Sequence, residues 1–161
     1  MIKIDKELLN ATSQKAKASQ RKRMNYNFHK KNSDRFQRFL NALEPGTYIR
    51  PHKHENPDKT EVFICLRGKI LVVEFDDCGE IIDSIILNSE SGNYGVEISP
   101  KAWHTIIGLE QSTVAYEIKD GEYNPDDDKN FAPWAPEENS PKADKYIDDI
   151  LVKLKISDLK K

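Results

Sequence analysis

The sequence predicts an all-β core, a sandwich or barrel of short strands, with a short helix at each end. Two observations predict it. From about residue 35 to residue 118, short apolar or alternating runs follow one another and are separated by turn residues. On both sides of this region the pattern changes to helix-forming or helically spaced residues. A chain of 161 residues is long enough for one domain with one sizeable core, so we expect a single domain over 1–161.

The N-terminal part, residues 1–33, is expected to be a helix followed by a basic arm. Residues 4–19 carry Leu, Ala, Lys and Gln, and Asp5 is placed to cap the helix. Seven Lys or Arg and no acid lie between Lys15 and Lys31. This basic arm is either a solvated charged face, a cover over the barrel mouth, or a contact with a second subunit.

The barrel is expected over residues 34–118. The predicted strands are 35–43, 46–52, 61–66, 69–76, 81–87, 94–98, 102–108 and 112–118. Between them, Gly46, Gly68 and Gly79 stand in segments suited to reversing the chain.

Residues 119–161 are predicted to form a C-terminal loop and helix. The first part is rich in Pro and Asp, and Trp134 stands between two prolines, where we expect it to anchor the loop onto the barrel. From about 141 to 155, apolar residues recur at helical spacing.

Composition excludes several functional classes. The chain has no apolar run long enough to span a membrane and no signal-peptide pattern at Met1, so we expect a cytoplasmic protein without membrane contact. Its two cysteines make neither a disulfide framework nor a zinc–cysteine site. The pI near 6.1 argues against nucleic-acid binding.

Three of the four histidines and one glutamate form a candidate metal site. His52 and His54 are two residues apart on a predicted strand, so both imidazoles point to the same face. Glu61 begins the next predicted strand, and His104 lies on a later one. We expect these four side chains to meet at one point.

Imidazole and carboxylate ligands suit Mn, Fe, Co, Ni, Cu or Zn, and they do not select among them. We expect one divalent transition metal, with Fe, Mn, Ni and Zn as the main candidates. Four ligands on an octahedral ion leave two positions for chemistry, whereas a tetrahedral zinc with the same ligands would be closed and structural. The alternative is a metal-free barrel whose polar residues line a sugar pocket.

The spacing of these residues resembles the first motif of the cupin family. Gly46, the pair His52-x-His54, Glu61 and Gly68 follow that motif apart from a longer loop before the glutamate. The segment 98–104 resembles the second motif, with Ser99 and Lys101 where Pro and Gly usually stand. The resemblance implies a cupin barrel, also called a double-stranded β-helix or jelly roll, and a homodimer.

Further segments extend the resemblance over nearly the whole chain. The segments 19–29, 48–54, 120–123 and 131–137 together resemble the WbuC-type cupin-fold metalloproteins. That family takes its name from bacterial O-antigen gene clusters. The resemblance implies a link to surface polysaccharide biosynthesis, without defining a reaction.

Substrate contacts are predicted from strand parity and charge. Arg50 and Tyr48 share the parity of His52, so both are expected inside the barrel near the metal. The Arg50 guanidinium then binds a substrate carboxylate or phosphate, or pairs with an acid of the barrel wall. Arg23, Asn25 and His29 of the basic arm are the other candidate substrate ligands.

These residues lead to three hypotheses about function; no catalytic residue is assigned. The first is a small metalloenzyme, such as an isomerase or epimerase, acting on a sugar or sugar-nucleotide intermediate. The second is an Fe(II)-dependent dioxygenase, and the third is a non-catalytic carbohydrate-binding or sensor protein. The ligand in each case is a small carbohydrate or anion.

Overall fold

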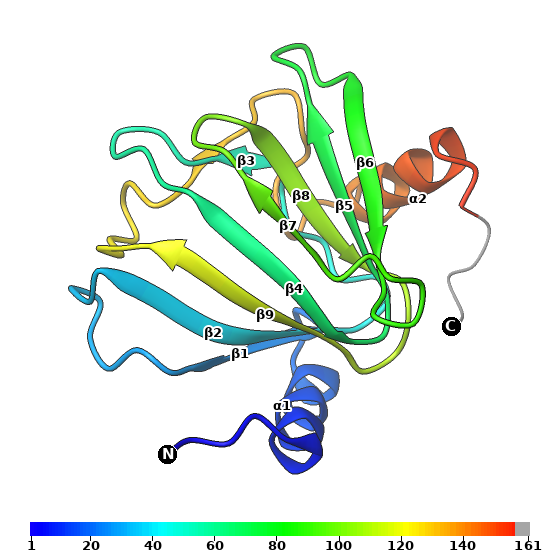
Figure 1. Ribbon diagram of the computed structural model, residues 1–161. Helices are drawn as coiled ribbons and strands as arrows, with labels where there is room; N and C mark the ends of the chain where they lie inside the picture. Colours follow the sequence, from blue (N-terminus) through cyan, green and yellow to red (C-terminus); the bar gives the residue numbers. More distant parts are fainter. Residues whose placement is uncertain (157–161) are drawn as a thin grey trace.

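Two five-stranded antiparallel sheets face each other and enclose the core in the computed structural model, which describes residues 1–156 (Figure 1). The strand orders are β1-β2-β9-β4-β7 and β10-β3-β8-β5-β6. In chain order the elements are α1 (Lys6–Ala18), β1 (Arg23–Asn27), β2 (Phe36–Leu43), β3 (His52–Lys53), β4 (Glu61–Arg67), β5 (Ile70–Phe75), β6 (Ile81–Leu87), β7 (Gly95–Ile98), β8 (Trp103–Gly108), β9 (Thr113–Asp120), β10 (Asn130–Phe131) and α2 (Ala143–Lys153). This confirms the predicted cupin jelly-roll barrel with its two short helices.

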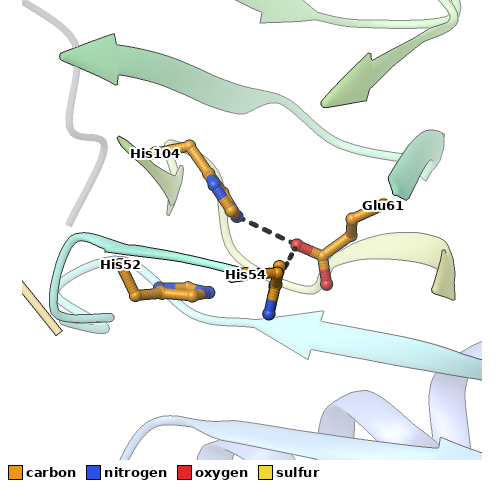
Figure 2. A group of neighbouring side chains, drawn as sticks. All are labelled: His52, His54, Glu61 and His104. Carbon is orange, nitrogen blue, oxygen red and sulfur yellow. Dashed lines mark hydrogen bonds and ion pairs between the residues drawn. The ribbon is translucent and has the colours of Figure 1, made fainter. Parts of the chain in front are cut away.

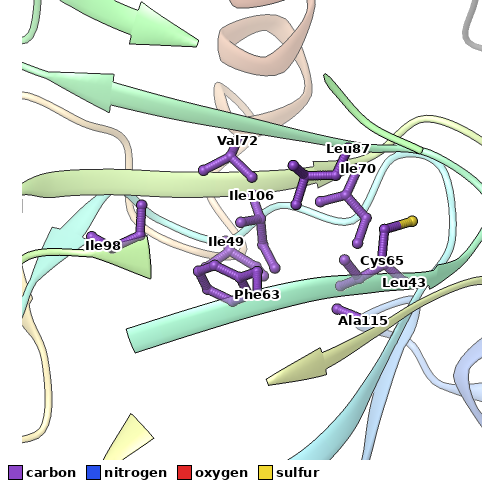
Figure 3. Packing of buried hydrophobic residues seen from close by; sticks show 10 residues of the cluster. All are labelled: Leu43, Ile49, Phe63, Cys65, Ile70, Val72, Leu87, Ile98, Ile106 and Ala115. Atoms are coloured by element: carbon purple, nitrogen blue, oxygen red, sulfur yellow. The ribbon is translucent and has the colours of Figure 1, made fainter. Parts of the chain in front are cut away.

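Alternating residues of the strands divide the apolar side chains between the barrel interior and the outer faces. On β5, Ile70 and Val72 point into the cluster between the sheets, whereas Leu71 and Val73 pack outward in the cluster that contains α2. Figure 3 shows the inner cluster, to which both sheets contribute. Because both faces of β5 are covered, this strand is almost continuously apolar.

Helix α1 covers the outer face of the first sheet. Asp5 caps it as expected, since the carboxylate accepts the Leu8 backbone N–H at 3.0 Å. The chain then leaves the helix and enters β1, which pairs with β2 along the edge of the sheet.

Strand β1 lies within the basic arm, where no strand was predicted from the sequence. Met24 and Phe28 alternate with polar residues and pack against the apolar cluster between α1 and the first sheet. Arg23 and Asn25 take the opposite parity. The period of two is present in the sequence, but the run of positive charge around it hides the pattern.

The predicted strand over residues 46–52 was wrong in extent. Only His52 and Lys53 form β3, and the chain from Glu44 to Pro51 has no regular pairing. Gly46 turns with φ +80° and Pro51 has no N–H to donate, so neither end of this segment can continue a ladder.

The C-terminal segment closes the other face of the barrel. Trp134 packs on Phe75 and Trp103, with ring centroids 5.1 and 6.1 Å away, which confirms its predicted role as an anchor. Helix α2 follows and buries Ile147, Ile150 and Leu151 against the second sheet. Neither helix within residues 1–156 is long and apolar enough to cross a membrane.

We expect Gly68→Ala to destabilise the fold far more than Gly92→Ala. Both glycines have positive φ, +77° and +85°, so each alanine carries a left-handed penalty of about 1–2 kcal/mol. Only at Gly68 would the new Cβ also clash with Thr113, whose Oγ1 lies nearest and whose Cα lies at 3.0 Å. Overpacking adds roughly 1–3 kcal/mol there. Urea unfolding followed by tryptophan fluorescence measures both; equal losses would contradict this packing.

Candidate metal centre and adjoining cavity

The four predicted metal ligands come together from both sheets (Figure 2). His52 on β3 lies directly opposite His104 on β8, and His54 follows two residues later. Glu61 begins β4 in the other sheet and points across the barrel toward the histidines. One donor atom from each residue lies within 4.8 Å of the others.

Backbone carbonyls fix the orientation of all three imidazoles. Nδ1 of His52 lies 2.9 Å from the Arg50 carbonyl oxygen, and Nδ1 of His104 lies 3.0 Å from that of Ala102. Nδ1 of His54 bonds to the Asp128 carbonyl oxygen. Because a carbonyl can only accept, each Nδ1 carries the proton, and in the neutral ring Nε2 keeps its lone pair. This is the arrangement that metal-binding histidines have in proteins.

The Nε2 atoms then meet an acceptor rather than a donor. Oε2 of Glu61 lies 2.9 Å from Nε2 of His104 and 3.3 Å from Nε2 of His54. Nε2 of His52 is buried without any partner. A lone pair facing a carboxylate oxygen is unfavourable unless a cation lies between them, and an unpaired buried nitrogen is costly. The group therefore fits a metal ion, which these four side chains would hold.

Burial and nearby charges determine which ligand of the site is neutral and which is anionic. Burial, together with the charge of Lys129, holds the pKa of His52 well below its usual range, which favours the neutral ligand form. Burial alone would raise the pKa of Glu61, but its contacts with His104 and His54 and the charge of Lys119 hold it well below the usual value. Glu61 is therefore the anionic ligand of the group.

A buried ion cluster supports the site from behind. Asp128 accepts from Lys59 at 2.9 Å and from Lys119 at 2.5 Å, and all three side chains are almost fully buried. Lys59 also donates to the Glu122 carbonyl at 2.5 Å. Since the Asp128 carbonyl holds His54, this cluster fixes both the loop after β9 and one ligand.

A small cavity adjoins three of the four ligands, and a larger one lies next to it. The small one, of about 30 Å³, is lined by His52, Glu61 and His104 together with Glu117 and Lys129. The larger one, of about 820 Å³, shares Glu117 and Lys129 with it and extends along β1 and β2. The ligand group therefore lies next to a cavity large enough for a small organic molecule, with Glu117 and Lys129 between them.

Four of the five predicted substrate ligands line the larger cavity: Arg23, Asn25, His29 and Arg50. Arg23 is already engaged, because it donates to the Tyr48 carbonyl and pairs with Glu138 at 2.7 Å. His29 accepts the Arg38 backbone N–H and lies apart from the ligand group.

Tyr48 was wrongly placed inside the barrel. Its ring packs against Tyr146 of α2, and its hydroxyl donates to the Pro136 carbonyl at 2.8 Å. The strand parity used for the prediction does not apply, because residues 44–51 are irregular. Ile49 takes the inward position instead.

Several inner residues escaped the sequence reasoning. Glu117 and Lys119 share the inward parity of Ala115 on β9, so charged residues at core positions were the available signal. Asn41 of β2 donates to Glu117 at 2.9 Å. Burial and the nearby Glu61 raise the pKa of Glu117 well above its usual value. Lys129 and Asp128 lie in a loop without periodicity, and no sequence signal marked them.

We expect His104→Ala to abolish metal binding and His29→Ala to leave it intact. His29 is the matched control because it is the only histidine outside the ligand group. The measurement is elemental analysis after equilibration with Zn²⁺ and desalting. Wild type and His29→Ala should retain about one metal per chain, and His104→Ala at least about tenfold less. Equal metal content in the two variants would rule out this site.

We expect Asp128→Asn to destabilise the protein by roughly 3–5 kcal/mol, because Lys59 and Lys119 lose their buried partner. The two lysines, chiefly Lys119, lower the pKa of Asp128 although burial opposes them. A lowered native pKa means that this stabilisation is present above about pH 4 and lost as pH falls through the native pKa.

Urea unfolding at several pH values measures this effect. The control is Asp126→Asn in the same loop, where the side chain is exposed. The control should unfold like wild type. If both variants lost the same stability, the buried cluster would not be the cause.

Comparisons with known proteins agree with the fold. The chain is 25% identical to the capsular polysaccharide assembling protein CapF of Staphylococcus aureus over 70% of this chain and 32% of that one, with a TM-score of 0.57. It thus spans about a third of CapF. TT1209 of Thermus thermophilus is 18% identical, with coverage of 74% and 97% and a TM-score of 0.53. L-ribose isomerase of Cellulomonas parahominis is 14% identical, with coverage of 65% and 60% and a TM-score of 0.50.

The last two likenesses concern the fold alone. No curated protein sequence matches the chain. A family model does match, over residues 4–87, which is just over half of the sequence and includes His52, His54 and Glu61. The chain therefore belongs to the family described as a domain of unknown function, DUF6016.

Proposed function

We propose that this protein is a metal-dependent cupin enzyme acting on a sugar or sugar-nucleotide intermediate of bacterial surface polysaccharide metabolism. One observation carries the proposal: three carbonyl-oriented histidines and Glu61 converge beside a small cavity that shares Glu117 and Lys129 with a cavity of about 820 Å³. A structural metal needs no such space beside it.

The cavity lining has the chemistry of a sugar site. Amide side chains, which both donate and accept, match the hydroxyl groups of a sugar, and aromatic rings offer apolar faces. The amides are Asn25, Asn27, Asn32, Gln37 and Asn41, and the rings are Phe39, Tyr123 and Phe131. This many amide side chains favours a polar ligand over an apolar one.

Two resemblances support the polysaccharide context. CapF, described as a capsular polysaccharide assembling protein, is 25% identical over the shared region. The segments that resemble WbuC-type cupins point to O-antigen clusters. We carry over only the substrate class, because the chain matches about a third of CapF.

A divalent metal bound by the four ligands supplies a Lewis acid that polarises a carbonyl or hydroxyl oxygen. Glu117 lies beside Glu61 and, because its pKa is raised, holds a proton near neutral pH. It is placed to exchange that proton with a substrate lying in either cavity. Asn41 orients the Glu117 carboxyl group.

We expect metal-loaded protein to exchange substrate C–H hydrogen for deuterium in D₂O, as sugar isomerisation or epimerisation by proton transfer requires. Sugar nucleotides are incubated with the protein and followed by NMR. Exchange should disappear on metal removal and in His104→Ala, and it should persist in Asp126→Asn, whose exposed side chain lines neither cavity.

Other outcomes identify the competing functions. Oxygen uptake that depends on Fe(II) and a sugar would indicate a dioxygenase. Metal-dependent sugar binding without any product would indicate a carbohydrate-binding protein. Exchange that survives complete metal removal would refute the proposal.

A further inference from the structure

Lys129 occupies an unusual position beside the ligand group. Strand β10 pairs with β3 so that Phe131 lies opposite His52 and Asn130 opposite Lys53. Continuing this register brings Lys129 opposite His54, on the same face as Phe131. The Phe131 ring indeed lies 6.2 Å from the His52 ring. Lys129 is thus brought to the metal end of the barrel by the backbone itself.

Lys129 has no fixed partner in the part of the chain described. Lys129 lines both cavities, and among residues 1–156 it makes neither a hydrogen bond nor an ion pair. The neighbouring acid, Asp128, forms no ion pair with Lys129, because it pairs with Lys59 and Lys119. Burial, together with the charge of Lys119, lowers the pKa of Lys129, as expected for an ammonium that lacks compensation.

Arg50 is a second cation with spare hydrogen-bonding capacity on the same cavity. One terminal nitrogen donates to the Ala132 carbonyl at 2.8 Å, and the guanidinium lies 5.5 Å from the Phe131 ring centre. Its Nε is buried without an acceptor. No carboxylate among residues 1–156 forms an ion pair with Arg50, so the barrel-wall partner considered from the sequence is absent there.

The inner end of the cavity therefore carries excess positive charge. Three cations line it, Lys119, Lys129 and Arg50, and Lys59 lies behind them on Asp128; the carboxyl groups nearby are Glu61, Glu117 and Asp128. A divalent metal on the four ligands adds two further positive charges. Buried charge of one sign is costly unless it is compensated, and the open cavity leaves room for a compensating anion.

We propose that Lys129 and Arg50 bind an oxyanion of the substrate, a carboxylate or a phosphate, next to the metal. The inference rests on the proposed function and names its substrate class: an acidic or phosphorylated sugar rather than a neutral one. Lys129 contacts the oxyanion at the junction of the two cavities, and Arg50 contacts it from the wall beside Phe131. One small substrate would then present its oxyanion to Lys129 and Arg50 and another of its oxygens to the metal.

The test measures anion binding rather than turnover. Zinc-loaded protein is titrated by calorimetry at constant ionic strength with inorganic phosphate and with acetate, which represent the two oxyanions; glucose is the neutral control. Lys129→Met should weaken binding of the preferred anion roughly 10- to 100-fold, and Lys129→Arg should keep most of it. The anion that binds in a Lys129-dependent manner identifies the phosphate or the carboxylate class.

Lys53→Met is the matched control. It removes the same charge from the neighbouring strand, but Lys53 pairs with Glu55 at 2.6 Å and lies over Trp103 rather than on either cavity. It should bind the anion like wild type. Equal weakening in Lys53→Met and Lys129→Met, or binding of neither anion by wild type, would overturn the inference.

Repeating the titration on metal-free protein separates the two proposals. Anion binding that still depends on Lys129 in the metal-free protein supports the oxyanion site of Lys129 and Arg50, even if no sugar reaction is found. Conversely, metal-dependent deuterium exchange with unchanged anion binding in Lys129→Met would support the proposed enzyme function and refute the oxyanion site.

Discussion

The carboxylate of Asp128, buried between Lys59 and Lys119, is the interaction on which the rest of the site depends. Two ammonium groups with almost no exposure would be too costly to bury without it. By pairing with Asp128, the two ammonium groups hold the loop that follows β9 against the end of the barrel. That loop aligns His54 through the Asp128 carbonyl and continues directly into Lys129 and β10. One ion cluster thus positions a metal ligand, the wall of the cavity and its free cation.

Glu61 has a comparable role between the two sheets. His52 and His104 belong to the second sheet and Glu61 to the first, so the ligand group connects the two sheets across the interior (Figure 2). The polar groups of the ligand site are tolerable at this depth because they have a defined partner or a place for a cation, whereas Lys129 and the Arg50 Nε have neither. The barrel is therefore apolar where it provides stability and polar where it opens to the cavity.

The fold and the ligand group could be predicted because both depend on local spacing. A period of two assigns the strands, and the interval between His52 and His54 places two imidazoles on one face. The errors arise where local rules fail. Tyr48 was misplaced because Gly46 and Pro51 interrupt the strand on which its parity was counted. Lys59, Asp128 and Lys129 were missed because their roles depend on contacts between distant segments, which no spacing reveals.

If the two proposals hold, metal and oxyanion occupy neighbouring positions, so their affinities are linked. If the oxyanion binds more tightly when the metal is present, the metal binds more tightly by the same factor when the oxyanion is present. The charge distribution sets the sign of this coupling, since Lys129, Arg50 and the metal all add positive charge to one end of the cavity. Without the anion, the same positive charges oppose metal binding. Lys129 already lowers the pKa of His52, which shows that it disfavours further positive charge at this site. A site of this kind holds its metal most firmly with an acidic substrate in place, and this coupling makes the metal itself a reporter of substrate binding.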